Sequence, residues 1–166
     1  MKDYRLGVIS DTHFPEYSGL PWDLIESHFN GIDTILHAGD ITSREVVDRL
    51  RLIAPVEAVC GNMDPPDLRL ELPEKIILNV NEVKIGLVHG AGLKIALKDK
   101  YHYFFDGSKI DAMVFGHTHL PFNRLIDNIL FFNPGSPAKP CFPNKPTIGI
   151  LTVSQSNQIS GEIISL

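Results

Sequence analysis

Five short apolar runs in this sequence are each followed at once by side chains of the types that bind metal ions. These side chains are carboxylates, imidazoles and one amide, namely Asp11, His13, Asp40, Asn62, His89, His117 and His119. Two carboxylates, four imidazoles and one amide oxygen are too many ligands for one tetrahedral ion, but they suit two ions that share a bridging ligand. A mixed oxygen and nitrogen set without thiolate suits Mn, Fe, Zn or Ni, and suits Mg less well. The sequence therefore predicts a site for two divalent cations.

Each of these motifs, taken alone, also has an ordinary structural explanation. Gly39-Asp40 and Gly61-Asn62 are common turn dipeptides, and His89 could be a hydrogen-bonded polar residue at the end of a strand. These explanations do not account for the joint occurrence of the motifs after successive apolar runs. The metal-site interpretation does account for it.

The local spacing adds two expectations about the backbone. Asp11 and His13, like His117 and His119, are separated by one residue, so in an extended chain both members of each pair would face the same side. Glycine stands beside a predicted ligand at positions 39, 61, 90 and 116, where close backbone turns are expected.

The elements of the first sixty residues predict a parallel sheet that would bring these side chains together. The expected strands are 6–10, 33–38 and 56–60, and the expected helices are 21–29 and 43–53. Ser43 is the expected N-cap of the second helix. Ligands bind beyond the carboxyl ends of parallel strands, so the side chains that follow these strands should converge.

The second half of the chain predicts mainly strands and hairpins. The expected strands are 75–80, 83–88, 111–115, 122–126, 129–132, 147–153 and 158–166, with a helix over 93–105 and an irregular loop over 133–146. Two sheets with outer helices use all of these elements, so the expected fold class is a layered α/β sandwich. Substrate specificity is expected to come from short loops such as 14–19, 65–69 and 137–146, or from a partner subunit.

Length and charge narrow the class of protein. With 166 residues, the chain is expected to form one domain over residues 1–166. A net charge of −5 argues against a surface that coats nucleic acid or an anchor to an anionic membrane. Two cysteines, Cys60 and Cys141, are too few for a disulfide framework and favour a reducing compartment, and no signal segment or membrane span is visible. We therefore expect a cytoplasmic protein, and the aromatic run at 101–105 could serve a homo-oligomer contact or the core.

The five blocks together resemble the signature of the calcineurin-like metallophosphoesterase superfamily. The residues that carry the resemblance are Asp11-Thr12-His13, Gly39-Asp40, Gly61-Asn62, Val88-His89-Gly90 and Gly116-His117-Thr118-His119. Gly61-Asn62-Met63-Asp64 and Asn133-Pro134-Gly135-Ser136 resemble its small bacterial and archaeal branch. The resemblance implies a four-layer α-β-β-α sandwich, with two mixed sheets packed face to face and helices outside.

The resemblance also implies a division of the seven ligands between two ions. It puts Asp11, His13 and His119 on the first ion, and Asn62, His89 and His117 on the second, with Asp40 bridging both. The implied reaction is hydrolysis of a phosphodiester, or of a phosphomonoester, by a bridging hydroxide, with Asp40, Asn62 and His89 as catalytic residues. Mn is the first expectation for the metal, and Ni, Fe or Zn are alternatives.

The expected substrate is a small phosphorylated molecule, with nucleic acid excluded except as a small phosphodiester. Asn62 and Arg44 are the candidate substrate-binding residues, since the amide nitrogen of Asn62 and the guanidinium of Arg44 could both reach a phosphate oxygen. Where many larger relatives have a histidine that helps the leaving group, this chain has Met63. Asp64 keeps the acidic end of the block, either to support the metal ligands or to fix the loop.

Two other functions compete with hydrolysis. The same superfamily includes a sorting subunit of the retromer that lost ligand residues and works by binding partners, but all seven positions are intact here. Redox chemistry at a di-iron site is the weaker alternative, because no electron relay is evident. His37, inside a predicted strand, is expected to be a core polar residue or to pack close to the site.

Overall fold

The computed structural model describes residues 2–13, 19–90, 101, 103–105, 108–138 and 145–166. One sheet contains β1 (Tyr4–Ile9), β2 (Thr34–His37), β3 (Val56–Ala58), β9 (Thr147–Val153) and β10 (Ile159–Ser165). The other contains β4 (Lys75–Val80), β5 (Val83–Val88), β6 (Ala112–Phe115), β7 (Phe122–Ile126) and β8 (Ile129–Asn133). The helices in this part of the chain are α1 (Trp22–His28), α2 (Arg44–Arg51) and α3 (Pro66–Glu71).

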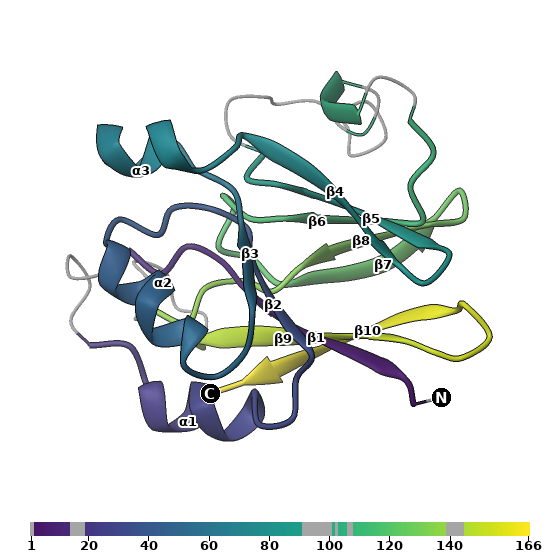
Figure 1. Ribbon diagram of the computed structural model, residues 1–166, viewed down its shortest axis with the longest axis horizontal. Coiled ribbons are helices and arrows are strands. Elements are labelled where there is room, and N and C mark those ends of the chain that lie inside the picture. The colour runs from purple at the N-terminus through teal and green to yellow at the C-terminus, as the bar shows by residue number, and fades with distance from the viewer. Residues whose placement is uncertain (1, 14–18, 91–100, 102, 106–107, 139–144) are drawn as a thin grey trace.

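The two sheets are both mixed and have five strands each (Figure 1). The strand orders are β10-β9-β1-β2-β3 and β4-β5-β6-β8-β7. Strands β1, β2 and β3 run parallel, and so do β5, β6 and β8. The loops that follow each parallel set therefore leave their sheet at one edge.

Alternating side chains of the parallel strands build two cores, one on each side of the first sheet. Leu6, Val8 and Leu36 pack against the second sheet, in a cluster that includes Ile85 and Val114. Their sequence neighbours point the other way, towards the helices. Burying each large apolar side chain of this kind contributes about 1.5–3 kcal/mol.

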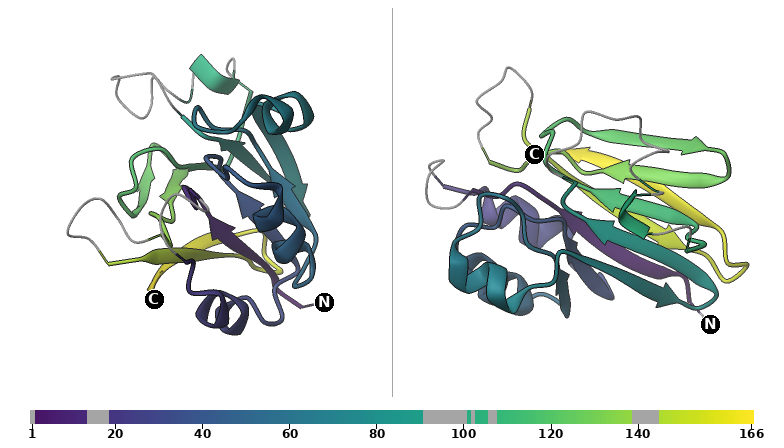
Figure 2. Two further views of the ribbon diagram at one scale, coloured as in Figure 1. Left: turned by 90° about the vertical axis from the view of Figure 1, so that its left-hand side faces the viewer. Right: turned by 90° about the horizontal axis from the view of Figure 1, so that it is seen from above.

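The helices cover the outer face of the first sheet (Figure 2). Ile9 and Ile35 contact a cluster that contains Ile25 of α1 and Leu50 of α2. The side chain of Ser43 accepts a hydrogen bond from the Glu45 N–H, which confirms the predicted N-cap of α2.

The outer face of the second sheet has a smaller apolar cover. Met113 and Phe131 pack with Phe105 and Ile110. Residues 103–105 are helical, but most of the helix predicted over 93–105 lies outside the described residues. Two packed sheets with helices outside confirm the predicted α/β sandwich.

The predicted hairpins are confirmed by their turn residues. Asn81 lies between β4 and β5 with a φ of 54°, and Asp127 and Asn128 between β7 and β8 have φ values of 49° and 65°. Two successive residues with positive φ match the twist of the adjoining strands.

The prediction of a loop at 65–69 is wrong, because Pro66 begins helix α3. Proline suits the first turn of a helix, since its fixed φ is helical and its missing N–H needs no partner there. Leu68 is 2% exposed and anchors the helix to the core under α2. No helix in the described part of the chain is both long and apolar enough to span a membrane.

Candidate metal centre

The predicted ligands lie on loops with unusual backbone conformations, and the extended pairs expected from the sequence are not found. Asp11, His13, Asp40, His117 and His119 all have positive φ, between 43° and 68°. This left-handed region is costly for residues with a Cβ atom, and such conformations cluster at functional sites. The backbone turns sharply at these five residues, so the alternation of side chains along an extended chain does not explain why they converge.

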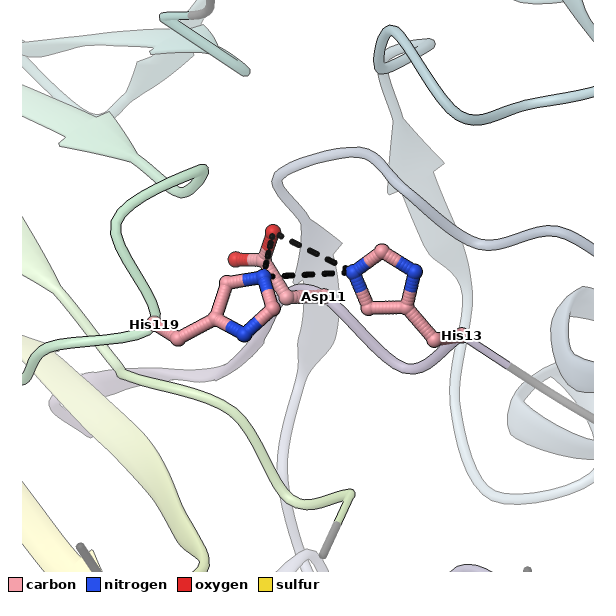
Figure 3. A group of neighbouring side chains, drawn as sticks. All are labelled: Asp11, His13 and His119. Atoms are coloured by element: carbon pink, nitrogen blue, oxygen red, sulfur yellow. Dashed lines mark hydrogen bonds and ion pairs between the residues drawn. The ribbon is translucent and has the colours of Figure 1, made fainter. Parts of the chain in front are cut away.

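The first group of ligands consists of Asp11, His13 and His119 (Figure 3). The Nε2 atoms of His13 and His119 are 3.2 Å apart. The Oδ1 atom of Asp11 lies 3.3 Å from Nε2 of His119 and 3.9 Å from Nε2 of His13. Three possible ligand atoms thus meet at one point, although His13 and His119 are separated by 106 positions in the sequence.

The second group consists of Asp40, His89 and His117, which also offer one ligand atom each within 4.8 Å of one another. Oδ2 of Asp40 is 3.2 Å from Nε2 of His89. Asn62 joins this group, because its Oδ1 atom is 3.1 Å from the same Nε2 atom. The structure thus gathers the side chains into the two groups that the resemblance implies, and their roles as ligands of two ions stay a prediction.

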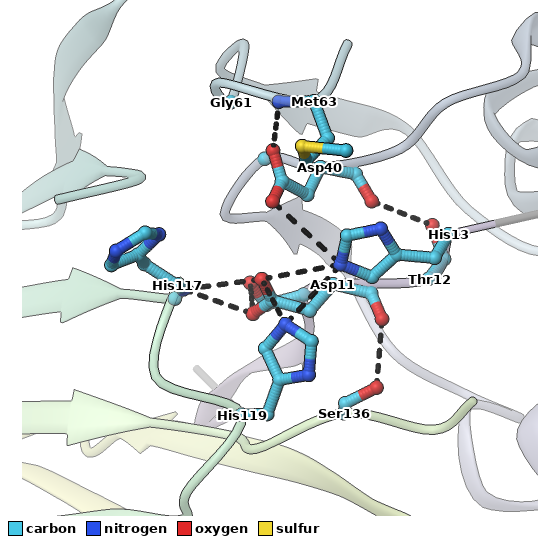
Figure 4. Close-up of polar contacts among 12 residues, drawn as sticks. Asp11, Thr12, His13, Asp40, Gly61, Met63, His117, His119 and Ser136 are labelled. Carbon is cyan, nitrogen blue, oxygen red and sulfur yellow. Dashed lines mark hydrogen bonds and ion pairs between the residues drawn. The ribbon is translucent and has the colours of Figure 1, made fainter. Parts of the chain in front are cut away.

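Asp40 lies between the two groups (Figure 4). Its Oδ2 atom is 3.6 Å from Nε2 of His13 in the first group and 3.2 Å from Nε2 of His89 in the second. Its other oxygen accepts a hydrogen bond of 2.8 Å from the Met63 N–H. The residue is 2% exposed, and its Oδ2 atom faces one histidine of each group.

The atoms at the centre of the site fit a cation. Nδ1 of His89 contacts the carbonyl oxygen of Ala38 at 2.8 Å and must donate to it, so the Nε2 lone pair of a neutral ring faces Asp40 and Asn62. When the ring is neutral, two oxygens and a nitrogen lone pair converge with no proton between them. A divalent metal ion satisfies all three at once, and so the donor set fits the predicted metal.

The pKa values of the metal-free site reflect the same arrangement. Burial lowers the pKa of His89, but hydrogen bonding to Asp40 and the nearby carboxylates outweigh it, and the net pKa is raised. The pKa of His119 is raised by its hydrogen bond to Asp11. Burial favours a higher pKa for Asp40, yet its hydrogen bonds to His89 and the Met63 N–H keep that pKa low. His89 and His119 therefore keep a proton to higher pH in the metal-free site than a free histidine does.

Asp11 is fixed by three neighbours, of which sequence reasoning missed Ser10 and Ser136 as parts of the site. Ser10 donates to its Oδ2 atom at 2.6 Å, and the His117 N–H donates to the same atom at 3.0 Å. Ser136 donates from Oγ to the Asp11 carbonyl at 2.7 Å. Ser136 follows β8, which lies parallel to β6, and that pairing is the signal that could have placed it at the site edge.

His37 lies beneath the site and ties two ligand loops together. Its Nδ1 atom accepts from the Gly39 N–H, so Nε2 carries the proton and donates to Oγ1 of Thr12. Burial lowers the pKa of His37 to about 3, so the ring is neutral. The expectation of a core polar residue next to the site is confirmed.

Two glycines leave room for the carboxylates. A Cβ atom on Gly61 would lie 2.1 Å from Oδ1 of Asp40, and one on Gly116 would lie 2.0 Å from Oγ of Ser10. Gly39 and Gly90 have φ values of 87° and 85°. The glycines predicted beside the ligands are thus required by space at two positions and by backbone conformation at the other two.

The segment after Asn62 stabilises the site through its backbone and Asp64. The carboxylate of Asp64 accepts from the N–H groups of Thr42 and Gly61, both at 2.7 Å. This confirms its loop-fixing role. The side chain of Met63 is 51% exposed and offers no proton. Arg44 forms an ion pair with Glu71 of α3, and its role in substrate binding stays a prediction.

Comparison with known proteins identifies the family. The family model of the calcineurin-like phosphoesterase superfamily domain matches residues 4–156 of this chain. The chain belongs to this superfamily. The resemblance inferred from the five blocks is therefore confirmed.

Two relatives illustrate the range within the superfamily. The chain is 36% identical over 163 residues to a protein of Methanocaldococcus jannaschii named probable metallophosphoesterase, with 97% of this chain and 81% of that protein covered. It is 26% identical over 165 residues to a protein of the same archaeon named phosphodiesterase, with 89% and 92% covered.

Solved structures of the protein Vps29 share the fold. Vps29 of Cryptosporidium parvum matches with a TM-score of 0.80 at 21% identity, over 100% of this chain and 99% of that one. Vps29 of Entamoeba histolytica complexed with zinc matches with a TM-score of 0.72 at 24% identity, over 97% and 98%. These likenesses concern the fold alone.

Proposed function

We propose that this metallophosphoesterase hydrolyses phosphodiesters, or phosphomonoesters, at a centre of two divalent metal ions. The observation that carries the proposal is the position of Asp40, whose Oδ2 atom is 3.6 Å from a ligand of one group and 3.2 Å from a ligand of the other. Asp11, His13 and His119 would hold one ion, and Asn62, His89 and His117 the other. We expect Mn first, with Ni, Fe or Zn as alternatives.

The chemistry of such a centre requires little from the protein beyond the ligands. When bound, two divalent ions would neutralise the charge of a phosphate and supply hydroxide as the nucleophile near neutral pH. Asp40 would contribute a carboxylate to both ions. The Ala38 carbonyl fixes the tautomer of His89, and Asn62 would offer its oxygen to an ion and its amide N–H groups to a phosphate oxygen.

The segment Gly61-Asn62-Met63 offers no proton donor for the leaving group. The backbone N–H of Met63 is engaged by Asp40, and its thioether side chain carries no acidic proton. Substrates whose leaving group needs no proton, such as nitrophenyl esters, should therefore be cleaved much faster than alkyl esters. We expect the enzyme to act on a small phosphorylated substrate in the cytoplasm, where Cys60 and Cys141 would stay reduced.

A chelation experiment tests the proposal. Protein dialysed against a chelator should lose hydrolysis of bis(p-nitrophenyl) phosphate and regain it with added Mn. Asp40→Asn and His117→Gln should each lower the restored rate at least about 100-fold, because each removes a ligand. His28→Gln changes a histidine at the end of α1, outside the site, and should match the parent protein. Absence of hydrolysis after reconstitution with each of the four metals would refute the proposal.

The likeness to Vps29 favours one second candidate, a scaffold of the same fold that acts through protein partners. Metal binding does not separate the two functions, since one Vps29 structure contains zinc. Turnover does separate them. A metal-loaded protein that binds Mn at the seven ligands and cleaves no phosphoester would favour the scaffold.

A further inference from the structure

A cavity of about 200 Å³ opens beside the second ligand group. Asn62 and His89 form the wall that adjoins the metal centre, and Cys60 lies next to them. Arg69, in the last turn of α3, Glu74, just before β4, and Phe104 also line it. Figure 1 shows α3 leading directly into β4. A phosphate held at the metal centre would therefore lie at the mouth of this cavity.

The two charged residues of the cavity are available to a ligand. Arg44, Arg49 and Arg51 on α2 each form an ion pair with a carboxylate. Within the described part of the chain, the side chains of Arg69 and Glu74 have no hydrogen bond and no ion pair. One presents donors and the other presents acceptors, and their charges cancel across the cavity.

The size and chemistry of the cavity define what it can accept. Its volume is smaller than the 300–1,000 Å³ or so typical of pockets for drug-sized ligands, so it suits one compact group. A second phosphate on the substrate would gain from Arg69 but be repelled by Glu74. An uncharged ring with both donors and acceptors can use both residues and pack against Phe104.

We infer that this cavity is the subsite for one ester substituent of the substrate, and that Arg69 and Glu74 determine its specificity. The preferred substituent is a compact, uncharged ring that bears hydrogen-bond donors and acceptors, the class to which the sugars and bases of nucleosides belong. The inference rests on the proposed function, because the metal centre must hold the phosphate to which the substituent is attached.

Equilibrium binding tests the subsite with ligands that carry a single substituent. Thymidine 5′-monophosphate and methyl phosphate share the phosphate and differ only in the group that would enter the cavity. Calorimetry on the Mn-loaded protein should show at least about tenfold tighter binding of the thymidine ligand. Arg69→Ala and Glu74→Ala should each raise its Kd roughly tenfold, as expected for one charged hydrogen bond, and change that of methyl phosphate less than about twofold.

Two further comparisons sharpen the test. Arg51→Ala removes an exposed arginine of α2 that pairs with Asp48, and it should bind both ligands as the parent protein does. Glu74→Gln leaves the charge of Arg69 unopposed, so it should bind 2-phosphoglycolate, whose substituent is a carboxylate, several-fold tighter than the parent protein.

The outcomes separate the two proposals. Equal affinity of the parent protein for both ligands, no measurable binding of either, or equal losses for both ligands in the Arg69 and Glu74 variants would overturn the subsite. Hydrolysis of bis(p-nitrophenyl) phosphate would still stand in those cases. Failure of that hydrolysis would instead remove the proposed function.

Discussion

Gly61→Ala should weaken metal binding without replacing a ligand. The added Cβ atom would lie 2.1 Å from Oδ1 of Asp40 and 2.3 Å from its backbone nitrogen. Ordinary van der Waals contact begins at 3.4 Å, so the two segments must separate by at least about 1.3 Å. The backbone nitrogen cannot rotate away, and the carboxylate is held by the Met63 N–H, so Asp40 itself must move.

The size of the effect follows from this displacement. Overpacking of a well-packed site costs about 1–3 kcal/mol of stability. A ligand misplaced by about 1 Å at a reacting centre can cost roughly 100-fold in rate. We therefore expect Gly61→Ala to fold with a lowered melting temperature, and to lose about two orders of magnitude in Mn-dependent hydrolysis together with a clear loss of Mn affinity.

The control is Gly31→Ala, at a glycine with open space around it. Gly31 has a φ of 73°, and no atom lies within 4 Å of the position that an added Cβ would take. Alanine there costs stability through its backbone conformation and not through contact with the site. Calorimetric Mn titration and circular dichroism of both variants separate the two effects. Folded Gly61→Ala protein with the parent affinity for Mn would refute the reasoning.

The remaining predictions concern pH and the leaving group. Because the pKa values of His89 and His119 are raised in the metal-free fold, their protons stabilise that fold fully below about pH 6.5, and this contribution is lost as pH rises through the raised values. Mn must displace the same protons, so the rise in melting temperature on adding Mn should grow between about pH 5.5 and 8.5; a constant rise would contradict the ligand assignment. His37, with a pKa of about 3, destabilises the fold as pH falls below 6.5. This effect is the same with and without Mn, so it does not change the rise in melting temperature that Mn causes. Met63→His should narrow the rate gap between nitrophenyl and alkyl esters by supplying a proton donor, and an unchanged gap would count against our account of the leaving group.

The sequence was sufficient to predict that the candidate ligands converge, because they follow apolar runs that form strands. Asp11 follows β1, Asp40 follows β2 and His117 follows β6, and the parallel pairing of these strands determines where their loops meet. The local geometry could not be predicted in the same way. The positive φ of Asp11 and His117 depends on hydrogen bonds between distant segments, such as that from the His117 N–H to the Asp11 carboxylate.

Helix α3 and the supporting residues escaped prediction for a related reason. A six-residue helix has too little periodicity to be recognised, and Leu68 shows its role only once the core that receives it is known. Ser136 stabilises Asp11 from 125 residues away, a contact that no local pattern announces. Serine is also among the commonest residues of loops, so its type alone carries no signal.

The position of the metal centre between the sheets couples the site to the fold. Asp11 and His13 leave the first sheet and His119 leaves the second, so the first ligand group spans both. The second group does the same, with Asp40 from the first sheet and His89 and His117 from the other. Each bound cation would therefore add its binding free energy to the packing of sheet on sheet, about 2.7 kcal/mol when its concentration is about 100 times Kd. The strained ligand loops cost stability in the metal-free protein, and the free energy of metal binding would offset that cost.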